Sequence, residues 1–191
     1  MLIILVGPSG AGKTTIETAL VERGVNKMIS VTTREPRVGE IHGEDYFFVT
    51  EEEFQRDIDR FFEVAEYAGH FYGTPRSQVN KAAMSREPYV TVMEVEGAKK
   101  LRDAFPGNVM LVYINRARKE LVKAINARQI LAVEKRRRVK KLNEDVKARG
   151  ECDYVVGNIS GKLDKAVESV YNITKQYCHD PVPCVVAEGR N

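Results

Sequence analysis

A glycine-rich segment directly behind an apolar run places the strongest constraint on how this chain can fold. Residues 7–14 read GPSGAGKT and fit the pattern G-x-x-x-x-G-K-[ST], while residues 2–6 read LIILV. The pattern requires a buried strand, a glycine-rich turn and a helix, and the backbone N–H groups of the turn then point at phosphate oxygens. A glycine-rich turn without a ligand is the alternative, and the flanking strand and helix argue against it. The residues expected to hold a nucleoside triphosphate are Ser9, Gly10, Ala11, Gly12, Lys13, Thr14 and Thr15.

Two of these side chains carry the expected chemistry. Lys13 places a point charge near the β- and γ-phosphates, and the Thr14 hydroxyl can hold Mg²⁺. Thr14 also begins a helix, whose N-terminal dipole favours anions. We therefore expect Lys13 to be catalytic and Thr14 to be a metal ligand.

Strand and helix patterns alternate along most of the chain, which predicts a parallel sheet with helices on both faces. This is the α/β, three-layer fold of P-loop NTPases. The expected strands of this core are residues 2–6, 28–32, 89–95, 109–114 and 153–156. The expected helices are residues 14–24, 75–86, 97–104, 117–149 with an interruption, and 161–177.

Residues 33–80 break this alternation and are expected to form a mixed α/β insertion over the strand ends, where ligands bind in α/β folds. The insertion begins with a long polar loop and continues with a strand at 45–49. A helix capping box, Thr50-x-x-Glu53, and a hairpin at 61–73 follow. The rest of the chain is expected to form a core of residues 1–32 and 81–177, which includes a helical lid at about 117–140. A tail of residues 178–191 follows and contains no recognised element.

The composition suits a globular protein rather than a disordered one. Charged residues make up 30% of the 191 residues, and the net charge is +3. Residues 135–141 hold six cations in seven positions, which we interpret as a solvated helix face or a lid that meets triphosphate rather than as a nucleic-acid site.

Residues 1–6 are too short to cross a bilayer, so a membrane partner is not expected. The odd number of cysteines predicts no disulfide framework, and a reducing cytoplasm is the expected compartment. A zinc site at Cys178, His179 and Cys184 is disfavoured, because three residues fall short of four ligands.

The insertion places two arginines three residues apart and a tyrosine nine residues later. Arg34 and Arg37 can clamp one phosphate, since guanidinium forks match phosphate oxygens. Tyr46 can donate a third hydrogen bond. A charged surface loop is the alternative for either arginine taken alone.

With these blocks included, residues 2–175 resemble the guanylate kinase family. The resemblance is carried by G-P-S-G-x-G-K, by S-x-T-T-R-x-P-R at 30–37 and by G-x-D-Y-x-F at 43–48. Glu63 after two apolar residues and Tyr72-Gly73-Thr74 complete it. The resemblance implies that an ATP γ-phosphoryl passes to GMP or dGMP, giving ADP and the diphosphate, with Mg²⁺ required.

The resemblance also implies roles for individual residues. Glu63 and Thr74 would read the base: a carboxylate can accept from guanine N1–H and the 2-amino group, and adenine lacks those donors. Asn158 would lie close to the adenine of ATP. The residues that would hold the acceptor phosphate are Ser30, Arg34, Arg37, Tyr46 and Tyr72.

Catalysis should consist of alignment and charge neutralisation, because the acceptor phosphate is already an anionic nucleophile. Lys13, Arg34 and lid arginines would provide the positive charge. The lid candidates are Arg128 and one or two residues of 136–138, of which Arg137 is our choice.

Two departures from the family pattern bear on rate and acceptor specificity. Related enzymes carry D-x-D-x-x-G, and here Val92 and Glu94 stand at the two acidic positions. Glu94 can still reach the metal or the guanine edge, which keeps it among the expected metal and acceptor residues. The lid is also short, since only residues 129–133 separate Arg128 from Glu134.

Three alternative functions remain open. One is a deoxynucleoside monophosphate kinase with altered or broadened base choice. Another is a non-catalytic scaffold that binds phosphopeptides at the same clamp, although such scaffolds usually lose the phosphate loop. The third is binding or phosphorylation of nucleic acid through residues 135–141.

Overall fold

The computed structural model describes residues 1–179 of the chain, and side chains up to residue 176. Its centre is a five-stranded sheet in the order β2-β7-β1-β8-β9, and every strand pair in it is parallel. All five residues of β1 are buried, as expected of a strand covered on both faces. The strands of this sheet are β1 (Leu2–Val6), β2 (Asn26–Lys27), β7 (Tyr89–Val92), β8 (Val109–Asn115) and β9 (Tyr154–Gly157).

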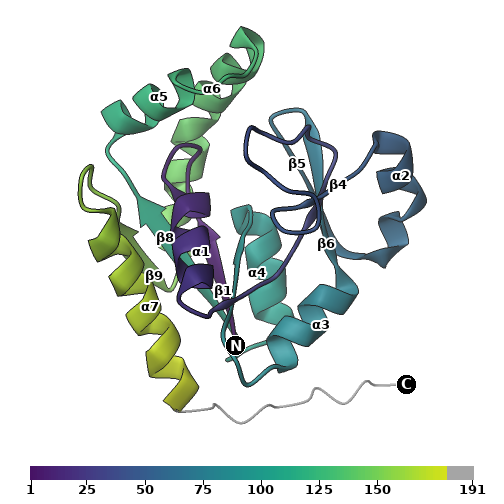
Figure 1. The fold of residues 1–191 in the computed structure, drawn as a ribbon, viewed down its shortest axis with the longest axis vertical. Helices are drawn as coiled ribbons and strands as arrows, with labels where there is room; N and C mark the ends of the chain where they lie inside the picture. Colours follow the sequence, from purple (N-terminus) through teal and green to yellow (C-terminus); the bar gives the residue numbers. More distant parts are fainter. Residues whose placement is uncertain (180–191) are drawn as a thin grey trace.

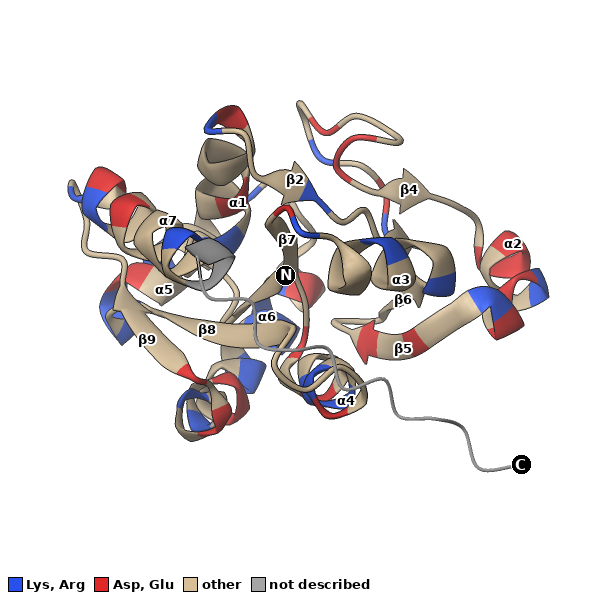
Figure 2. Ribbon diagram, turned by 90° about the horizontal axis from the view of Figure 1, so that it is seen from below, with Lys and Arg blue, Asp and Glu red and all other residues tan. Residues whose placement is uncertain are grey.

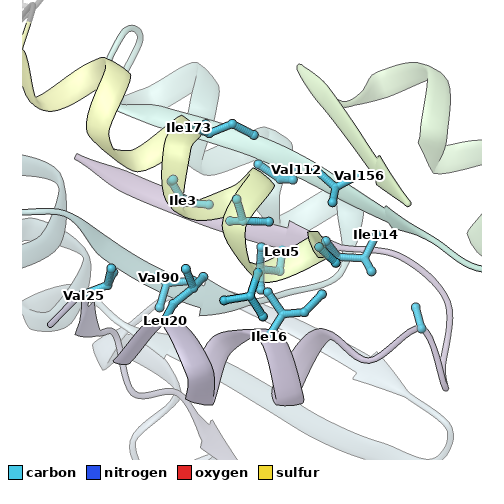
Figure 3. Packing of buried hydrophobic residues seen from close by; sticks show 14 of the residues in the cluster. Ile3, Leu5, Ile16, Leu20, Val25, Val90, Val112, Ile114, Val156 and Ile173 are labelled. Carbon is cyan, nitrogen blue, oxygen red and sulfur yellow. The ribbon is translucent and has the colours of Figure 1, made fainter. Parts of the chain in front are cut away.

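Helices cover both faces of this sheet, which confirms the predicted three-layer α/β fold (Figure 1). Successive side chains of a strand point to opposite faces. Ile3 and Leu5 of β1 pack with Ile16 and Leu20 of α1 (Lys13–Glu22) and with α7 (Leu163–His179), as Figure 3 shows. The alternate residues of β1 pack against α3 (Arg76–Met84) and α4 (Val95–Ala104) on the other face.

A second sheet, in the order β4-β3-β6-β5, lies beside the core and is built largely from the predicted insertion (Figure 1). The predicted hairpin is confirmed: β5 and β6 pair antiparallel, with Glu63 opposite Thr74. The predicted capping box is also present, because Thr50 and Glu53 bond each other's backbone N–H at the start of α2. The elements here are β3 (Val31–Thr32), β4 (Phe47–Phe48), α2 (Glu51–Arg56), a 3₁₀ turn (Ile58–Arg60), β5 (Phe61–Tyr67) and β6 (His70–Pro75).

The expected strand at 28–32 was wrong as a single element. The chain instead forms β2, which pairs with β7 of the core, and then β3, which pairs with β4 and β6 of the second sheet. Each is two residues long, so the chain passes from one sheet to the other between Lys27 and Val31. The strand expected at 45–49 is likewise reduced to Phe47–Phe48.

The interrupted helical region forms α5 (Arg118–Asn126) and α6 (Ala132–Lys147), followed by a 3₁₀ turn (Ala148–Glu151). Charged residues of both signs occur along these helices, whereas β8 and β9 contain none (Figure 2). The basic run 135–141 is not wholly solvated, because Arg138 within it is 3% exposed. None of the helices within residues 1–179 has the length and apolar character of a membrane span. Helix α7 extends over residues 178 and 179, and the rest of the expected tail, including Cys184, lies outside the described residues.

Candidate active site

The phosphate loop occupies the turn between β1 and α1. Gly12 stands at the N-cap of α1 with φ of 92°, a left-handed conformation that favours glycine. A Cβ at this position would lie 2.4 Å from Nδ2 of Asn158, so a larger residue would also clash. The shape of the loop is therefore fixed both by its own backbone and by a neighbouring side chain.

Two side chains from the ends of neighbouring strands support this loop. Asn158, just after β9, donates from Nδ2 to the Ala11 carbonyl at 2.8 Å. Arg116, just after β8, donates from Nη1 to the Gly10 carbonyl at 3.0 Å. Asn158 was expected beside adenine, and the structure places it, 7% exposed, against the loop itself. Sequence reasoning missed Arg116, although its place at the carboxyl end of β8 marks it as a candidate.

Lys13 lies among carbonyls of the loop, donating from Nζ to the Gly7 carbonyl and, at 3.1 Å, to the Pro8 carbonyl. Burial lowers the pKa of Lys13 to about 8, and Glu94 and Asp145 partly oppose that shift. A partly buried ammonium beside a row of backbone N–H groups favours the binding of anionic oxygens.

One cavity of about 300 Å³ joins the phosphate loop to the second sheet. All the expected triphosphate residues from Ser9 to Thr15 line it. Expected residues of the acceptor and lid regions also line it, namely Arg37, Tyr46, Tyr72, Glu94 and Arg128. The wall further includes Arg138, one of the three lid candidates at 136–138. It also includes three residues that the sequence did not single out as site residues, namely Tyr67, Val92 and Met93.

The two predicted clamp arginines lie differently. Arg37 lines the cavity, whereas Arg34 is 6% exposed and forks onto Glu40, with Nη1–Oε2 and Nη2–Oε1 distances of 2.9 and 3.0 Å. Glu40 also lies 3.6 Å from Nη1 of Arg37 and accepts from its backbone N–H at 2.7 Å. Nε of Arg34 is buried without a hydrogen-bond partner among the described residues. Sequence reasoning missed Glu40, which holds both arginines.

The two predicted tyrosines meet at the cavity wall. The Tyr46 and Tyr72 rings lie edge to face with centroids 6.1 Å apart, and the Arg34 guanidinium lies 5.5 Å from the Tyr46 ring centroid. Burial, followed by the charge of Glu17, raises the pKa of Tyr46, so its hydroxyl stays a hydrogen-bond donor at neutral pH. Ser30 is buried and lies outside the cavity lining, and its carbonyl accepts from the Phe47 N–H at 2.9 Å.

The two residues of the predicted base-reading pair lie together and are not among those that line the cavity. Glu63 and Thr74 are cross-strand neighbours and are 7% and 2% exposed. Burial raises the pKa of Glu63, Lys100 opposes the shift, and Glu94 adds to it. The carboxylate packs on the first turn of α4, where a Cβ on Gly97 would lie 2.5 Å from Cδ of Glu63.

Two lid arginines converge on the hydroxyl of Ser9 in the phosphate loop. Nη1 of Arg128 and Nη1 of Arg138 lie 3.2 and 3.3 Å from Oγ of Ser9. Burial, then the positive charges of Arg37 and Arg138, lowers the pKa of Arg128 to about 10. Guanidiniums gathered in this way produce a positive potential that suits a polyphosphate.

The cavity lining includes Arg138 and not the expected Arg137, so the geometry favours Arg138 as the second lid arginine. Arg137 is exposed and lies against the hairpin turn, where a Cβ on Gly69 would be 2.7 Å from its Nη1. Arg138 instead faces inward and bonds Glu134 one helical turn earlier, at 2.5 and 2.9 Å. The signal available in the sequence was Leu142: residues four apart share a helix face, and Leu142 is apolar and buried.

Thr14 and Glu94 both line the cavity and fit a magnesium ion. Mg²⁺ is usually held by one or two carboxylates together with substrate phosphates and water. Within residues 1–179, no three His, Cys, Asp or Glu residues gather in a way that would hold a metal without substrate. Lys141 pairs with Glu94 at 3.1 Å, and Val92 leaves an apolar wall at the position where the family resemblance leads one to expect an acid.

Comparisons with known proteins agree with this geometry. The guanylate kinase family model matches residues 1–177. The guanylate kinase of Caldanaerobacter subterraneus subsp. tengcongensis is 38% identical over 175 residues, covering 89% of this chain and 84% of the relative. The guanylate kinase of Prochlorococcus marinus subsp. pastoris is 36% identical over 182 residues, covering 91% and 96%. A crystal structure of guanylate kinase from Anaplasma phagocytophilum superimposes with a TM-score of 0.76 at 26% identity, covering 97% of this chain and 89% of that one. The chain belongs to the guanylate kinase family.

Proposed function

We propose that this protein transfers the γ-phosphoryl group of ATP to GMP or dGMP, giving ADP and GDP or dGDP. The observation that supports this best is the single cavity shared by the phosphate loop, by Arg37, Tyr46 and Tyr72 of the insertion, and by Arg128 and Arg138 of the lid. Such an arrangement would bring two phosphate-bearing ligands side by side in one cavity, as transfer between them requires.

The donor triphosphate would bind to the loop from Ser9 to Thr15, with Lys13 beside the β- and γ-phosphates. Asn158 and Arg116 keep the loop in shape through the Ala11 and Gly10 carbonyls. Thr14 and Glu94 would hold Mg²⁺, which when bound neutralises charge on the phosphates.

The acceptor phosphate would bind to Arg37, Tyr46 and Tyr72 at the cavity wall. The Arg34 guanidinium, held by Glu40, packs on the Tyr46 ring and so helps to position this group. The Ser30 carbonyl accepts a hydrogen bond from the first residue of β4. Glu63 and Thr74 would read the guanine edge. A buried carboxylate discriminates strongly, because a base without matching donors leaves it unpaired.

The transfer step needs no strong general base, since the attacking acceptor oxygen is already anionic. Lys13, Arg128 and Arg138 would instead balance the charge that spreads over the transferring phosphoryl. Ser9 sets the position of both lid arginines through its hydroxyl. Residues 33–80 would act as the acceptor-binding unit, residues 1–32 and 81–177 as the donor-binding core, and the cytoplasm as the working compartment.

A panel of acceptors tests this function. Purified protein with Mg²⁺ and ATP should phosphorylate GMP and dGMP well, and dTMP, AMP and dCMP poorly. If GMP and dGMP were inert while a monophosphate with another base was phosphorylated, the roles of Glu63 and Thr74 would be refuted. If calorimetry detected no ATP binding, a non-catalytic scaffold would replace the kinase.

A broadened base choice is the second candidate. It is favoured by Val92 at the position of an expected acid and by the pairing of Glu94 with Lys141, which together leave fewer free carboxylates near the base. Comparable kcat/KM values for GMP and a second monophosphate would support it.

A further inference from the structure

A buried carboxylate on α1 has no role in the site described so far. Glu17 lies one helical turn beyond the phosphate loop and is 4% exposed. An ionised carboxylate is costly to bury unless it is paired. Its partner is Lys27 of β2, whose Nζ lies 3.6 Å from Oε2 of Glu17.

Lys27 also reaches across to the second sheet. Its Nζ lies 3.2 Å from Oδ1 of Asp45, so one ammonium joins a carboxylate of the core to a carboxylate of the insertion. The other oxygen of Asp45 accepts from the backbone N–H of Ile41 at 2.9 Å. The bridge therefore fixes the loop that leads into the acceptor region.

The residue after Asp45 is Tyr46, which lines the cavity and meets Tyr72. Lys27 is the last residue of β2, immediately before the chain leaves the core sheet for β3. Residues 17, 27 and 45 are thus distant in sequence but converge at the junction between the two sheets. The charged bridge at this junction therefore holds Asp45, and with it the adjacent Tyr46, against the core.

Burial raises the pKa of Glu17 to about 7, and Lys27 opposes this shift, while Asp45 adds to it. A hydrogen bond with the Val92 backbone also lowers the pKa of Glu17. Helix α1 thus brings a carboxylate next to Val92, the position at which the expected acid is missing.

We propose that Glu17 and Lys27 are positioning residues for acceptor binding, because the Glu17–Lys27–Asp45 bridge holds Tyr46 in place against the core. This inference rests on the proposed function. Neither residue lines the cavity, so the bridge would act on the acceptor only through Tyr46. The donor site, which shares α1 but not the bridge, is unaffected.

The test compares Glu17→Gln and Lys27→Met with the unmodified protein. The dissociation constant for GMP and the KM for GMP should each rise about tenfold, since a displaced contact residue loses the worth of about one hydrogen bond to a charged group. The dissociation constant for ATP and the kcat at saturating GMP should stay within about twofold. Lys27→Arg, which keeps the charge, should restore most of the GMP affinity.

Glu22→Gln is the matched control, because Glu22 lies on the same helix and is exposed. It should change neither constant. Coupling through Tyr46 is tested by a double-mutant cycle: GMP should bind to the Glu17→Gln/Tyr46→Phe protein as it does to Tyr46→Phe alone.

The inference is overturned if Glu17→Gln leaves GMP binding unchanged, if ATP binding weakens as much as GMP binding, or if the double-mutant effects add. If Glu17→Gln does not fold, the contrast between Lys27→Met and Lys27→Arg decides in the same way. If the unmodified protein phosphorylates GMP and the variants bind GMP as tightly as it does, only this inference is refuted. An unmodified protein that cannot phosphorylate GMP refutes the proposed function and this inference with it.

Discussion

Replacing Arg138 by methionine, with Arg137→Met as the matched control, tests whether the inward-facing lid arginine performs the chemistry. The two residues are neighbours on α6 and carry the same charge. Arg138 is 3% exposed and contacts Ser9 in the phosphate loop, whereas Arg137 is exposed at the hairpin turn. Any difference between the two variants therefore reports on position rather than on net charge.

The expected size of the effect follows from burial. Two unit charges about 4 Å apart interact by roughly 4 kcal/mol at an effective dielectric constant of about 20, and by about 1 kcal/mol in water. At 1.36 kcal/mol for each tenfold change in rate, Arg138→Met should lower kcat by about 10³-fold and Arg137→Met by less than about tenfold. This agrees with the range of about 10³ to 10⁵ for arginines that stabilise phosphoryl transfer.

A coupled assay of ADP formation at saturating ATP and GMP gives the required kcat values. Thermal unfolding of each variant checks that Glu134, which loses its partner in Arg138→Met, has not destabilised α6. Arg138→Lys should recover part of the rate, because it keeps the charge but not the fork. If both methionine variants lost activity equally, or if only Arg137→Met did, the assignment drawn from the geometry would be refuted.

Three further perturbations have defined outcomes. Gly97→Ala places a Cβ 2.5 Å from Cδ of Glu63, so the KM for GMP should rise by about tenfold or more while the affinity for ATP is kept. Equal KM values for the variant and the unmodified protein would show that Glu63 does not take part in base recognition. Lys13 has a pKa lowered to about 8, mainly by burial, and ATP phosphates favour its charged form. ATP binding near pH 8 to 9 should therefore take up a proton, seen as a dependence of the calorimetric enthalpy on the buffer, and affinity should fall as pH rises through this range. Thr50→Ala removes the side-chain cap of α2 and should lower the free energy of unfolding in urea by about 1 kcal/mol; a change within error would mean that the cap contributes nothing.

Features with a local cause were predictable from the sequence. The buried run of β1, the glycine-rich turn after it and the Thr50 cap each depend on neighbouring residues alone. The hairpin at residues 61–75 has its turn at Ala68 and Gly69, both with positive φ, and Gly69 is visible in the sequence. The alternation of strand and helix patterns predicted the three-layer fold, and the family resemblance supplied Tyr46 and Tyr72 of the cavity wall.

Features that depend on distant partners were not predictable in this way. β2 and β3 are each two residues long, and they pair with β7 and with β4 and β6, respectively, so no local pattern marks where one sheet ends and the next begins. Glu40 is recognisable only once the loop has folded back onto both arginines. Arg138 was among the lid candidates but was not chosen, because its contact with Ser9 in the phosphate loop joins residues 129 positions apart in the sequence.

Strand β5 connects Glu63, the proposed base-recognition residue, with the lid. Glu63 and Tyr67 are both buried on one face of this paired strand, four residues or about 13 Å apart, and Tyr67 lies under Arg138 and Lys141 of α6. A single inserted or deleted residue between them would turn one of the two to the opposite face. With the proposed role of Glu63, a change in the length of β5 would alter acceptor recognition and the contact between Tyr67 and α6 at the same time.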